Sequence, residues 1–202
     1  MKFSHFWMDN LNNKKDRIIN AAIDVFRQMG IEKAKIADIT QKAGVAQGTF
    51  YLYFPSKLSV MPDIAEKMVL LTVDDIQASV DVNAPFSQQL EQIVDSVFRQ
   101  IKAHRDIHAF IHAGLAQTGS LKEWESLYQP FYEQMSRFLE HFKTEGILRQ
   151  SLCAQDAAKL VIGLIESTAE QVYLYDTSKE STEDLRKNQL LDFLCHALLS
   201  ES

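Results

Sequence analysis

Polar and aromatic side chains that can form specific hydrogen bonds alternate along the stretch Gln47–Tyr53. Gln47 offers an amide, Thr49 offers a hydroxyl and a methyl group, and Tyr51 offers a phenol. In the major groove of DNA, amides pair with adenine and side-chain methyl groups contact the thymine methyl. These three residues could therefore read base edges if one helix presents them together on its outer side.

Groups suited to phosphate flank these residues. Tyr53 carries a phenol, and Lys35 and Lys57 carry ammonium groups, all of which can donate to phosphate oxygens. Lys57 follows Ser56, the expected cap of a further helix, so its ammonium and the amides of that first turn could share one phosphate. The predicted DNA-contacting residues are therefore Lys35, Gln47, Gly48, Thr49, Tyr51, Tyr53 and Lys57.

Two short helices joined by a tight turn must position these side chains. Apolar residues recur at helical spacing from Ile36 to Ala43, and Gly44 can adopt the left-handed conformation that ends a helix. In the second helix, Phe50 and Phe54 stand four residues apart and therefore face inward together. The arrangement predicts a helix-turn-helix that leaves the polar side chains outside.

The stretch 43–57, AGVAQGTFYLYFPSK, resembles the signature of the tetracycline-repressor (TetR) family, A-G-V-x-x-G-T-x-Y-x-Y-F-x-S-K. Upstream residues also fit that family's pattern, namely Ala21, Ala22, Phe26, Gly30 and Ile39. The match covers the first third of the chain. It implies a DNA-binding head of three helices, followed by a helical body that binds a ligand and dimerises.

Two positions depart from the family's pattern. The family usually has serine or threonine where Lys35 stands, and the lost hydroxyl cap costs about 1 kcal/mol unless another group replaces it. Thr40 stands where the family usually has alanine, and we expect its hydroxyl to bond back to the carbonyl of Ile36.

Apolar periodicity along the chain predicts an all-α protein of about nine helices. The expected helices span residues 14–29, 36–43, 47–54, 56–80, 86–103, 105–115, 121–144, 155–175 and 183–199. Pro62 predicts a bend or break near Met61, either a hinge or a local irregularity, and Pro130 predicts a kink in the helix around it. We expect a DNA-binding domain over residues 1–58 and a ligand-binding and dimerisation domain over residues 59–202.

Charge is unevenly distributed along the chain. Residues 1–60 carry nine Lys/Arg and five Asp/Glu, whereas the remaining residues carry 12 and 22. A basic head on an acidic body agrees with DNA binding confined to one end. The two cysteines, Cys153 and Cys195, lack metal-site spacing, and no apolar run approaches the ~18 residues of a membrane span. We therefore expect a cytoplasmic protein without membrane segments.

The middle helices are rich in aromatic residues and histidines. Such side chains suit an apolar or flat ligand, and the resemblance implies an inducer pocket here, although they could simply fill the core. The spacing of His104, His108 and His112 favours one histidine at a pocket or interface over all three on one metal ion. The candidate pocket residues are His108, Phe110, His112, Trp124, Tyr128, Phe131 and Tyr132, with no metal and no cofactor expected.

The last two predicted helices, 155–175 and 183–199, are apolar on more than one side. Gly163 and Ala169 would let a partner backbone approach closely, so we expect both helices to form a four-helix bundle with a second copy. They could instead be ordinary core helices of a monomer. Dimerisation is favoured because two half-sites multiply the affinity of one short reading helix.

The sequence lacks common enzyme motifs such as G-x-S-x-G or a phosphate-binding loop, so we expect no enzymatic activity. The favoured function is a ligand-responsive transcriptional regulator, a repressor that binds a near-palindromic operator as a homodimer and is released by a small-molecule inducer. Activation of transcription instead of repression stays open, because which of the two results from DNA binding depends on where the operator lies. The alternative is a small-molecule binding or carrier protein that keeps a vestigial DNA-binding head.

Overall fold

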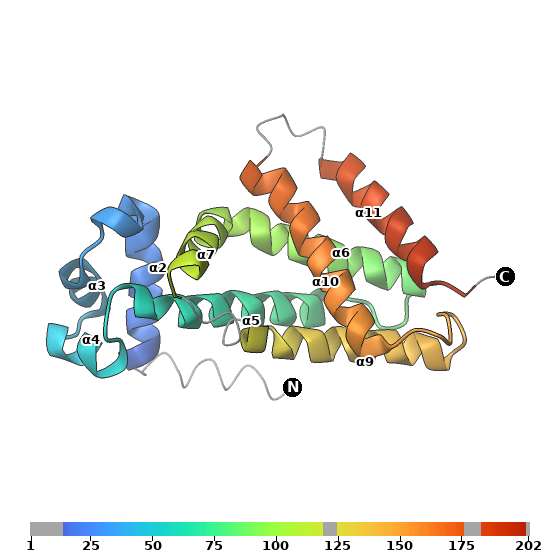
Figure 1. Ribbon diagram of the computed structural model, residues 1–202, viewed down its shortest axis with the longest axis horizontal. Coiled ribbons are helices and arrows are strands. Elements are labelled where there is room, and N and C mark those ends of the chain that lie inside the picture. The colour runs from blue at the N-terminus through green and yellow to red at the C-terminus, as the bar shows by residue number, and fades with distance from the viewer. Residues whose placement is uncertain (1–13, 119–124, 176–182, 201–202) are drawn as a thin grey trace. The chain divides into compact units, whose positions relative to one another are not determined.

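The computed structural model describes residues 14–118, 125–175 and 183–200, apart from the side chains of residues 112–118. These residues are helical almost throughout (Figure 1), which confirms the predicted all-α class. The only extended pairing in these ranges is an isolated antiparallel bridge between Leu148 and Leu199. Over the same ranges, no helix combines the length and the apolar character that crossing a membrane requires.

The chain divides into two compact units. The first unit comprises Met1–Glu66 and Asp106–Trp124, and the second unit comprises Lys67–Arg105 and Glu125–Ser202. Helix α5 (Met61–Ser79) gives residues 61–66 to the first unit and its remainder to the second. The domain boundary expected after residue 58 stays a prediction.

The described part of the first unit contains six helical elements: α2 (Lys14–Lys33), α3 (Ile36–Ala43), α4 (Gln47–Tyr53), the 3-10 helix η1 (Leu58–Val60), the start of α5, and α7 (Arg105–Thr118). Helix α2 packs against both α3 and α4. The side chains between these helices are buried and apolar, and they include Ile18, Ala22, Phe26, Ile39 and Phe50. Their recurrence at three and four residues along α2 is the pattern of one buried helix face.

Gly30 interrupts α2 where the sequence predicts its end. Its φ of 78° and ψ of 157° lie outside the helical range, and a positive φ favours glycine. One further helical turn follows at Ile31–Lys33 before α3 begins. The predicted end after Met29 is therefore confirmed for the regular part of the helix. The short helical turn beyond Gly30 was not predicted.

The chain enters α5 through a reciprocal pair of serines. The Ser59 N–H donates to Oγ of Ser56 (3.2 Å), and the Ser56 N–H donates to Oγ of Ser59 (3.0 Å). The 3-10 helix η1 spans this entry, and regular α-helix begins at Met61 with Pro62 as its second residue. A proline is tolerated in the first turn of a helix. The break predicted near Met61 is confirmed as a change from 3-10 helix to α-helix.

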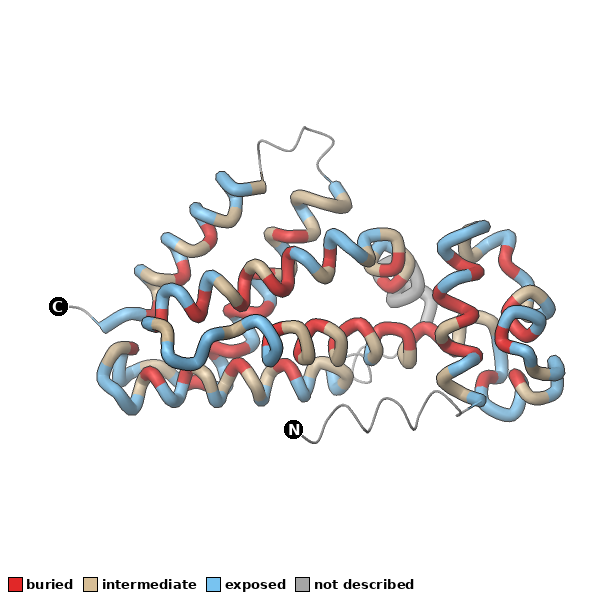
Figure 2. Tube along the Cα trace, turned by 180° about the vertical axis from the view of Figure 1, so that it is seen from behind, coloured by how far each residue is buried: buried red, intermediate tan, exposed pale blue. Residues whose placement is uncertain are grey.

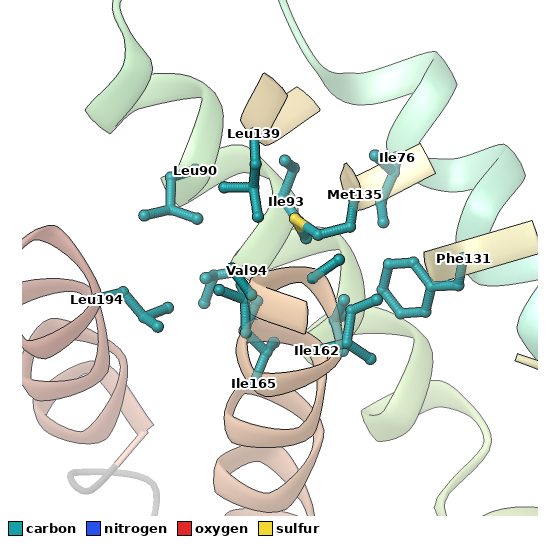
Figure 3. Packing of buried hydrophobic residues seen from close by; sticks show 14 of the residues in the cluster. Ile76, Leu90, Ile93, Val94, Phe131, Met135, Leu139, Ile162, Ile165 and Leu194 are labelled. Carbon is teal, nitrogen blue, oxygen red and sulfur yellow. The ribbon is translucent and has the colours of Figure 1, made fainter. Parts of the chain in front are cut away.

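The second unit contains the rest of α5, α6 (Phe86–Ala103), α9 (Gln129–Thr144), α10 (Ala154–Glu170), the π-helix η2 (Gln171–Tyr175) and α11 (Glu183–Leu198). Helix α10 packs against α6, α9 and α11. Apolar side chains between these helices form a continuous core, part of which Figure 3 shows at Leu90, Val94, Leu139, Ile165 and Leu194. This core holds the second unit together without any β-sheet in the described ranges.

Burial follows the helical period, with buried and exposed positions alternating along each helix (Figure 2). Helix α11 is the least covered of the long helices in the second unit, because its buried residues are Leu190, Leu194 and Leu198. These lie four apart and form one narrow stripe. The other sides of α11 are left open within a single copy of the chain.

The helix predicted over residues 121–144 is interrupted beside Pro130, and the discontinuity is a full break where a kink was predicted. Residues 125–127 are helical, the chain turns at Tyr128, and α9 begins at the next residue, with the proline in its first turn. A proline there breaks no helical hydrogen bond. The predicted boundary between helices 86–103 and 105–115 is confirmed, because His104 is the C-cap of α6 and α7 begins at Arg105, so His104 and His108 lie on different helices.

Candidate nucleic-acid interface

Helix α4 is held in place by two buried phenylalanines. Phe50 is fully buried and Phe54 is 2 % exposed, and their ring centroids lie 5.5 Å apart. The turn before α4 is made by Gly44, whose φ of 64° and ψ of 41° are left-handed. The Val45 N–H closes this turn by donating to the carbonyl of Thr40 (3.0 Å). Helix α3, the turn and α4 therefore form the predicted helix-turn-helix.

The opposite side of α4 is open to solvent. Gln47 and Gly48 are exposed, Thr49 is half-buried, and Tyr51 and Tyr53 are 55 % and 41 % exposed. The structure thus separates the two kinds of side chain that the sequence predicts, with the phenylalanines inside and the polar groups outside.

Leu52 is the residue of α4 that the sequence reasoning missed. It is 81 % exposed, the highest value among the large apolar side chains of the described ranges. A leucine between two tyrosines is easily taken for a core residue, because leucine is most often buried. Leu52 lies two residues from both Phe50 and Phe54, so it cannot share their inward side of the helix. This spacing is the signal that could have predicted its exposure. An exposed apolar side chain beside Tyr51 could contact a thymine methyl.

The Asp38 carboxylate at the start of α3 caps the N–H of the N-cap residue, which is a different donor from the one that a hydroxyl at position 35 would satisfy. Lys35 is the extended N-cap residue, and its N–H donates to Oδ2 of Asp38 (2.9 Å), which is one half of a capping box. The Lys35 side chain is exposed. The hydroxyl of Thr40 donates to the carbonyl of Ala37 (3.1 Å) and not to that of Ile36 as predicted, because a helical threonine can reach either carbonyl.

The ammonium of Lys57 is directed to the protein's own backbone. Its Nζ donates to the carbonyl oxygens of Ile31, Glu32 (3.3 Å) and Ala34 (2.9 Å), around the last turn of α2. Carbonyl groups at a helix end lack intrahelical partners, and a lysine can satisfy them. A phosphate would compete with these bonds, and the phosphate contact of Lys57 stays a prediction.

Arg17 plays the same part at the end of α3. Its Nη2 donates to the carbonyl oxygens of Ala43 (2.6 Å) and Gly44 (3.1 Å). A Cβ added to Gly44 would lie 2.8 Å from that nitrogen, so the glycine also leaves room for the guanidinium. Nearby, Lys15 forms an ion pair with Asp63. Several cations of the first unit therefore hold its helices together.

The predicted ligand-pocket residues are distributed over both units. Tyr128, Phe131 and Tyr132 belong to the second unit, and His108 and Phe110 lie on α7 in the first. Trp124 and the side chain of His112 lie outside the described residues. Phe131 lines a pocket of about 250 Å³ that lies wholly within the second unit. The contribution of each residue to ligand binding stays a prediction.

Two of these residues, Tyr128 and Tyr132, stack on each other with ring centroids 5.8 Å apart. The Tyr132 phenol donates to Oε2 of Glu125 (3.3 Å), and Nζ of Lys159 lies 4.9 Å from the centre of the Tyr132 ring. Burial, assisted by the Glu125 carboxylate, raises the pKa of Tyr132 to about 12. The pair is therefore a neutral aromatic platform tied to surface charges.

Glu166 of α10 lies beside this platform. Burial, together with the nearby Glu170 carboxylate, raises the pKa of its carboxyl to about 8, although a hydrogen bond with Tyr128 opposes the rise. A carboxyl with such a pKa keeps its proton at neutral pH. No group of three or more His, Cys, Asp or Glu residues within the described part of the chain could hold a metal ion.

Helices α10 and α11 expose large apolar side chains. Leu160 and Leu164 of α10 are exposed, as are Leu185 and Phe193 of α11. Gly163 of α10 is also exposed, and a Cβ added there would meet nothing within 4 Å. These are side chains of the kind that an interface buries, and the dimer contact predicted for the two helices stays a prediction.

An exposed second helix that carries amide, hydroxyl and phenol groups, held by a glycine turn over an aromatic core, defines a helix-turn-helix DNA-binding protein. Comparison with known proteins then gives the family. Residues 18–64 match bacterial regulatory proteins of the tetR family, and residues 90–198 match the tetracyclin repressor-like C-terminal domain. The chain belongs to the TetR family of DNA-binding transcriptional regulators, and it is not an enzyme.

Relatives match along most of the chain. The HTH-type transcriptional regulator YvdT of Bacillus subtilis is 34 % identical over 187 residues, which cover 93 % of this chain and 96 % of YvdT. The fatty acid degradation regulator FadR from Bacillus halodurans has a TM-score of 0.72 at 22 % identity, covering 91 % of this chain and 95 % of that one. FadR from Bacillus subtilis in complex with stearoyl-CoA has a TM-score of 0.70 at 20 % identity, covering 89 % and 96 %. At such identities the two FadR structures show the fold alone.

Proposed function

We propose that this regulator is a ligand-responsive repressor, which binds a near-palindromic operator as a homodimer and releases it when a small molecule binds. The observation that carries the DNA-binding part is the exposed side of α4, where polar groups stand over two buried phenylalanines. Proteins with a helix-turn-helix insert such a helix into the major groove.

Three side chains of α4 are proposed to read base edges. The Gln47 amide suits adenine, the Thr49 methyl suits thymine, and the Tyr51 phenol can donate to an acceptor in the groove. Tyr53 and Lys35 are exposed at the two ends of the helix-turn-helix, and we assign them to phosphate oxygens.

Gly48 and Lys57 complete the proposed DNA contacts. Nothing lies within 4 Å of a Cβ added to Gly48, so the backbone there is open to a close approach by a DNA strand. Lys57 could reach a phosphate only by giving up a bond to a backbone carbonyl. Its main contribution is therefore to hold the end of α2, from which the helix-turn-helix starts.

Dimerisation through α10 and α11 supports recognition of a near-palindrome. Their exposed leucines, together with Phe193, would be removed from water by a second copy. A two-fold dimer would present two copies of α4 to successive major grooves, whose separation is about 34–36 Å. Two linked half-sites would bind far more tightly than one.

The ligand-responsive part is supported by the family and by related structures. FadR from Bacillus subtilis shares this fold and was solved with stearoyl-CoA. A ligand that favours one spacing of the two heads would change operator affinity, typically through a coupling of about 1–3 kcal/mol. A carrier protein with a vestigial head would instead bind a ligand and show no salt-sensitive DNA binding.

The test uses fluorescence anisotropy with DNA from upstream of the protein's own reading frame. We expect Gln47→Ala to lose about tenfold or more of the affinity for the preferred sequence, while binding to random DNA changes little. Gln28→Ala is the matched control, because this exposed amide lies on α2 away from the reading helix. If Gln47→Ala binds the preferred sequence as tightly as the control does, the assignment of α4 as the reader is wrong.

A further inference from the structure

The pocket lined by Phe131 lies between three helices of the second unit. Ile76 of α5, Ile93 of α6, and Phe131 and Met135 of α9 all line it, and Figure 3 shows these four side chains near one another. Its volume is about 250 Å³. For comparison, an apolar cavity of about 150 Å³ in another protein binds benzene. A single aromatic ring with a short alkyl chain would therefore fit.

The lining of this pocket carries no charge. Seven of its residues are apolar and three are glutamines, with no Asp, Glu, Lys, Arg or His among them. A charged group that entered would lose its hydration without meeting a counter-ion, which is strongly unfavourable. The lining therefore selects a neutral and mostly apolar ligand.

One polar atom in the lining has no partner. Oε1 of Gln134 is buried and accepts no hydrogen bond from the described residues. A buried acceptor left without a donor is costly, and native structures contain few of them. Gln89, in the same lining, differs because its Nε2 donates to the carbonyl oxygens of Val82 (3.1 Å) and Ala84 (2.7 Å). Gln134 is thus the group that a bound molecule could satisfy.

We propose that this pocket binds a neutral, mostly apolar small molecule with one hydrogen-bond donor, a hydroxyl or an N–H, which donates to Oε1 of Gln134. The apolar part of the ligand would pack against Phe131, Ile93 and Met135. This inference deepens the proposed function by naming the chemical class of the inducer, and its regulatory meaning rests on that function. Binding itself does not depend on DNA.

The test is isothermal titration calorimetry on the full chain with two matched probes. The probes are 4-propylphenol, which has a donor, and 4-propylanisole, which has the same skeleton without one. We expect the parent protein to bind the phenol about tenfold more tightly, the factor that one satisfied hydrogen bond contributes. In Gln134→Met the preference should vanish, because methionine fills a similar volume and accepts only weakly.

Two further variants keep the test decisive. Gln88→Met makes the same substitution at an exposed glutamine of α6 outside the pocket lining and should keep the preference for the phenol. Val80→Phe should fill the pocket and abolish binding of both probes while the circular dichroism spectrum stays helical. Equal binding of phenol and anisole to the parent, no binding of either, or a preference retained in Gln134→Met would each overturn the inference.

The DNA experiment separates this inference from the proposed function. If the parent fails to bind the phenol and still selects its upstream DNA, the pocket assignment fails and the DNA-binding function stands. If the phenol binds with the predicted preference and operator affinity does not change, the pocket stands and ligand-induced release through it fails.

Discussion

At the scale of single residues, cations of the first unit are used to close helix ends. Lys57 bonds to carbonyl groups around the end of α2, and Arg17 bonds to those at the end of α3. Both side chains come from segments distant in sequence, so they fix how the helices meet. The orientation of α4 toward solvent depends on these contacts as well as on Phe50.

Lys57→Met should therefore destabilise the protein more than it weakens phosphate binding. The substitution keeps the apolar stem and leaves the backbone carbonyls without their ammonium donor, which costs about 1–3 kcal/mol of unfolding free energy. Urea denaturation followed by circular dichroism measures this loss. Lys33→Met, at an exposed lysine of α2, is the control and should be nearly neutral. An unchanged stability combined with a flatter salt dependence of DNA binding would show Lys57 to be a phosphate ligand instead.

The Glu166 carboxyl gives the second unit a pH-dependent stability. Burial raises its pKa from the ordinary 4.5 to about 8 in the folded state. The contribution of this carboxyl to the free energy of unfolding is therefore complete below about pH 4. It is lost as the pH rises toward 8, by at most about 1.4 kcal/mol per pH unit. Glu166→Gln should remove this pH-dependent loss of stability. The stability of the variant relative to the parent should therefore increase from pH 5 to pH 8.

Thermal or urea unfolding across that pH range measures the difference. Glu140→Gln, at an exposed carboxyl of α9, is the control and should follow the parent. Parallel pH profiles for the parent and Glu166→Gln would mean that the carboxyl is ionised in the folded protein.

At the scale of elements, the sequence was informative wherever an apolar period met a clear end signal. The bounds of α6 are those predicted, and Gly44 and Gly30 both end regular helix with positive φ. Around Pro130 a kink was predicted and a break is observed, because the same residue that kinks a helix interior also starts a helix, and local sequence does not say which. The separation of α6 from α7 at His104 also lies where it was predicted.

The pocket was only partly predictable for a related reason. Phe131 was among the candidates, whereas Gln134 was not, because a glutamine on an amphipathic helix normally faces water. Its burial depends on α5 and α6, which lie far away in sequence. The helix-turn-helix, by contrast, is defined by neighbours within the stretch 36–57, so its geometry followed from local spacing.

The exposed apolar side of α10 and α11 leads to a prediction about association. Leu160→Glu should weaken self-association by more than about tenfold, because a carboxylate would be buried in the proposed interface without a partner. Size-exclusion chromatography with light scattering measures the oligomeric state. Leu52→Glu, at the exposed leucine of α4, is the matched control and should leave it unchanged. A parent protein that stays monomeric at micromolar concentration would remove the basis for the dimer.

At the scale of the whole molecule, a basic head and an acidic body divide the work of the chain. Residues 1–60 hold the excess of lysine and arginine, and the remainder holds the excess of carboxylates. DNA attraction is thereby concentrated in the segment that carries α4, while the ligand and the second copy that we propose would bind to the acidic remainder. This division is what a regulator needs if ligand binding and DNA binding are to be coupled.

The measurement that tests this account most directly is a hydroxyl-radical footprint on DNA from upstream of the protein's own reading frame. We expect two protected segments on one face of the duplex, centred about one helical turn apart and related by a two-fold axis. The protection should disappear from both segments together in Gln47→Ala. A single protected segment, or protection that spreads evenly along the DNA, would contradict the proposal that two copies of α4 grip one operator.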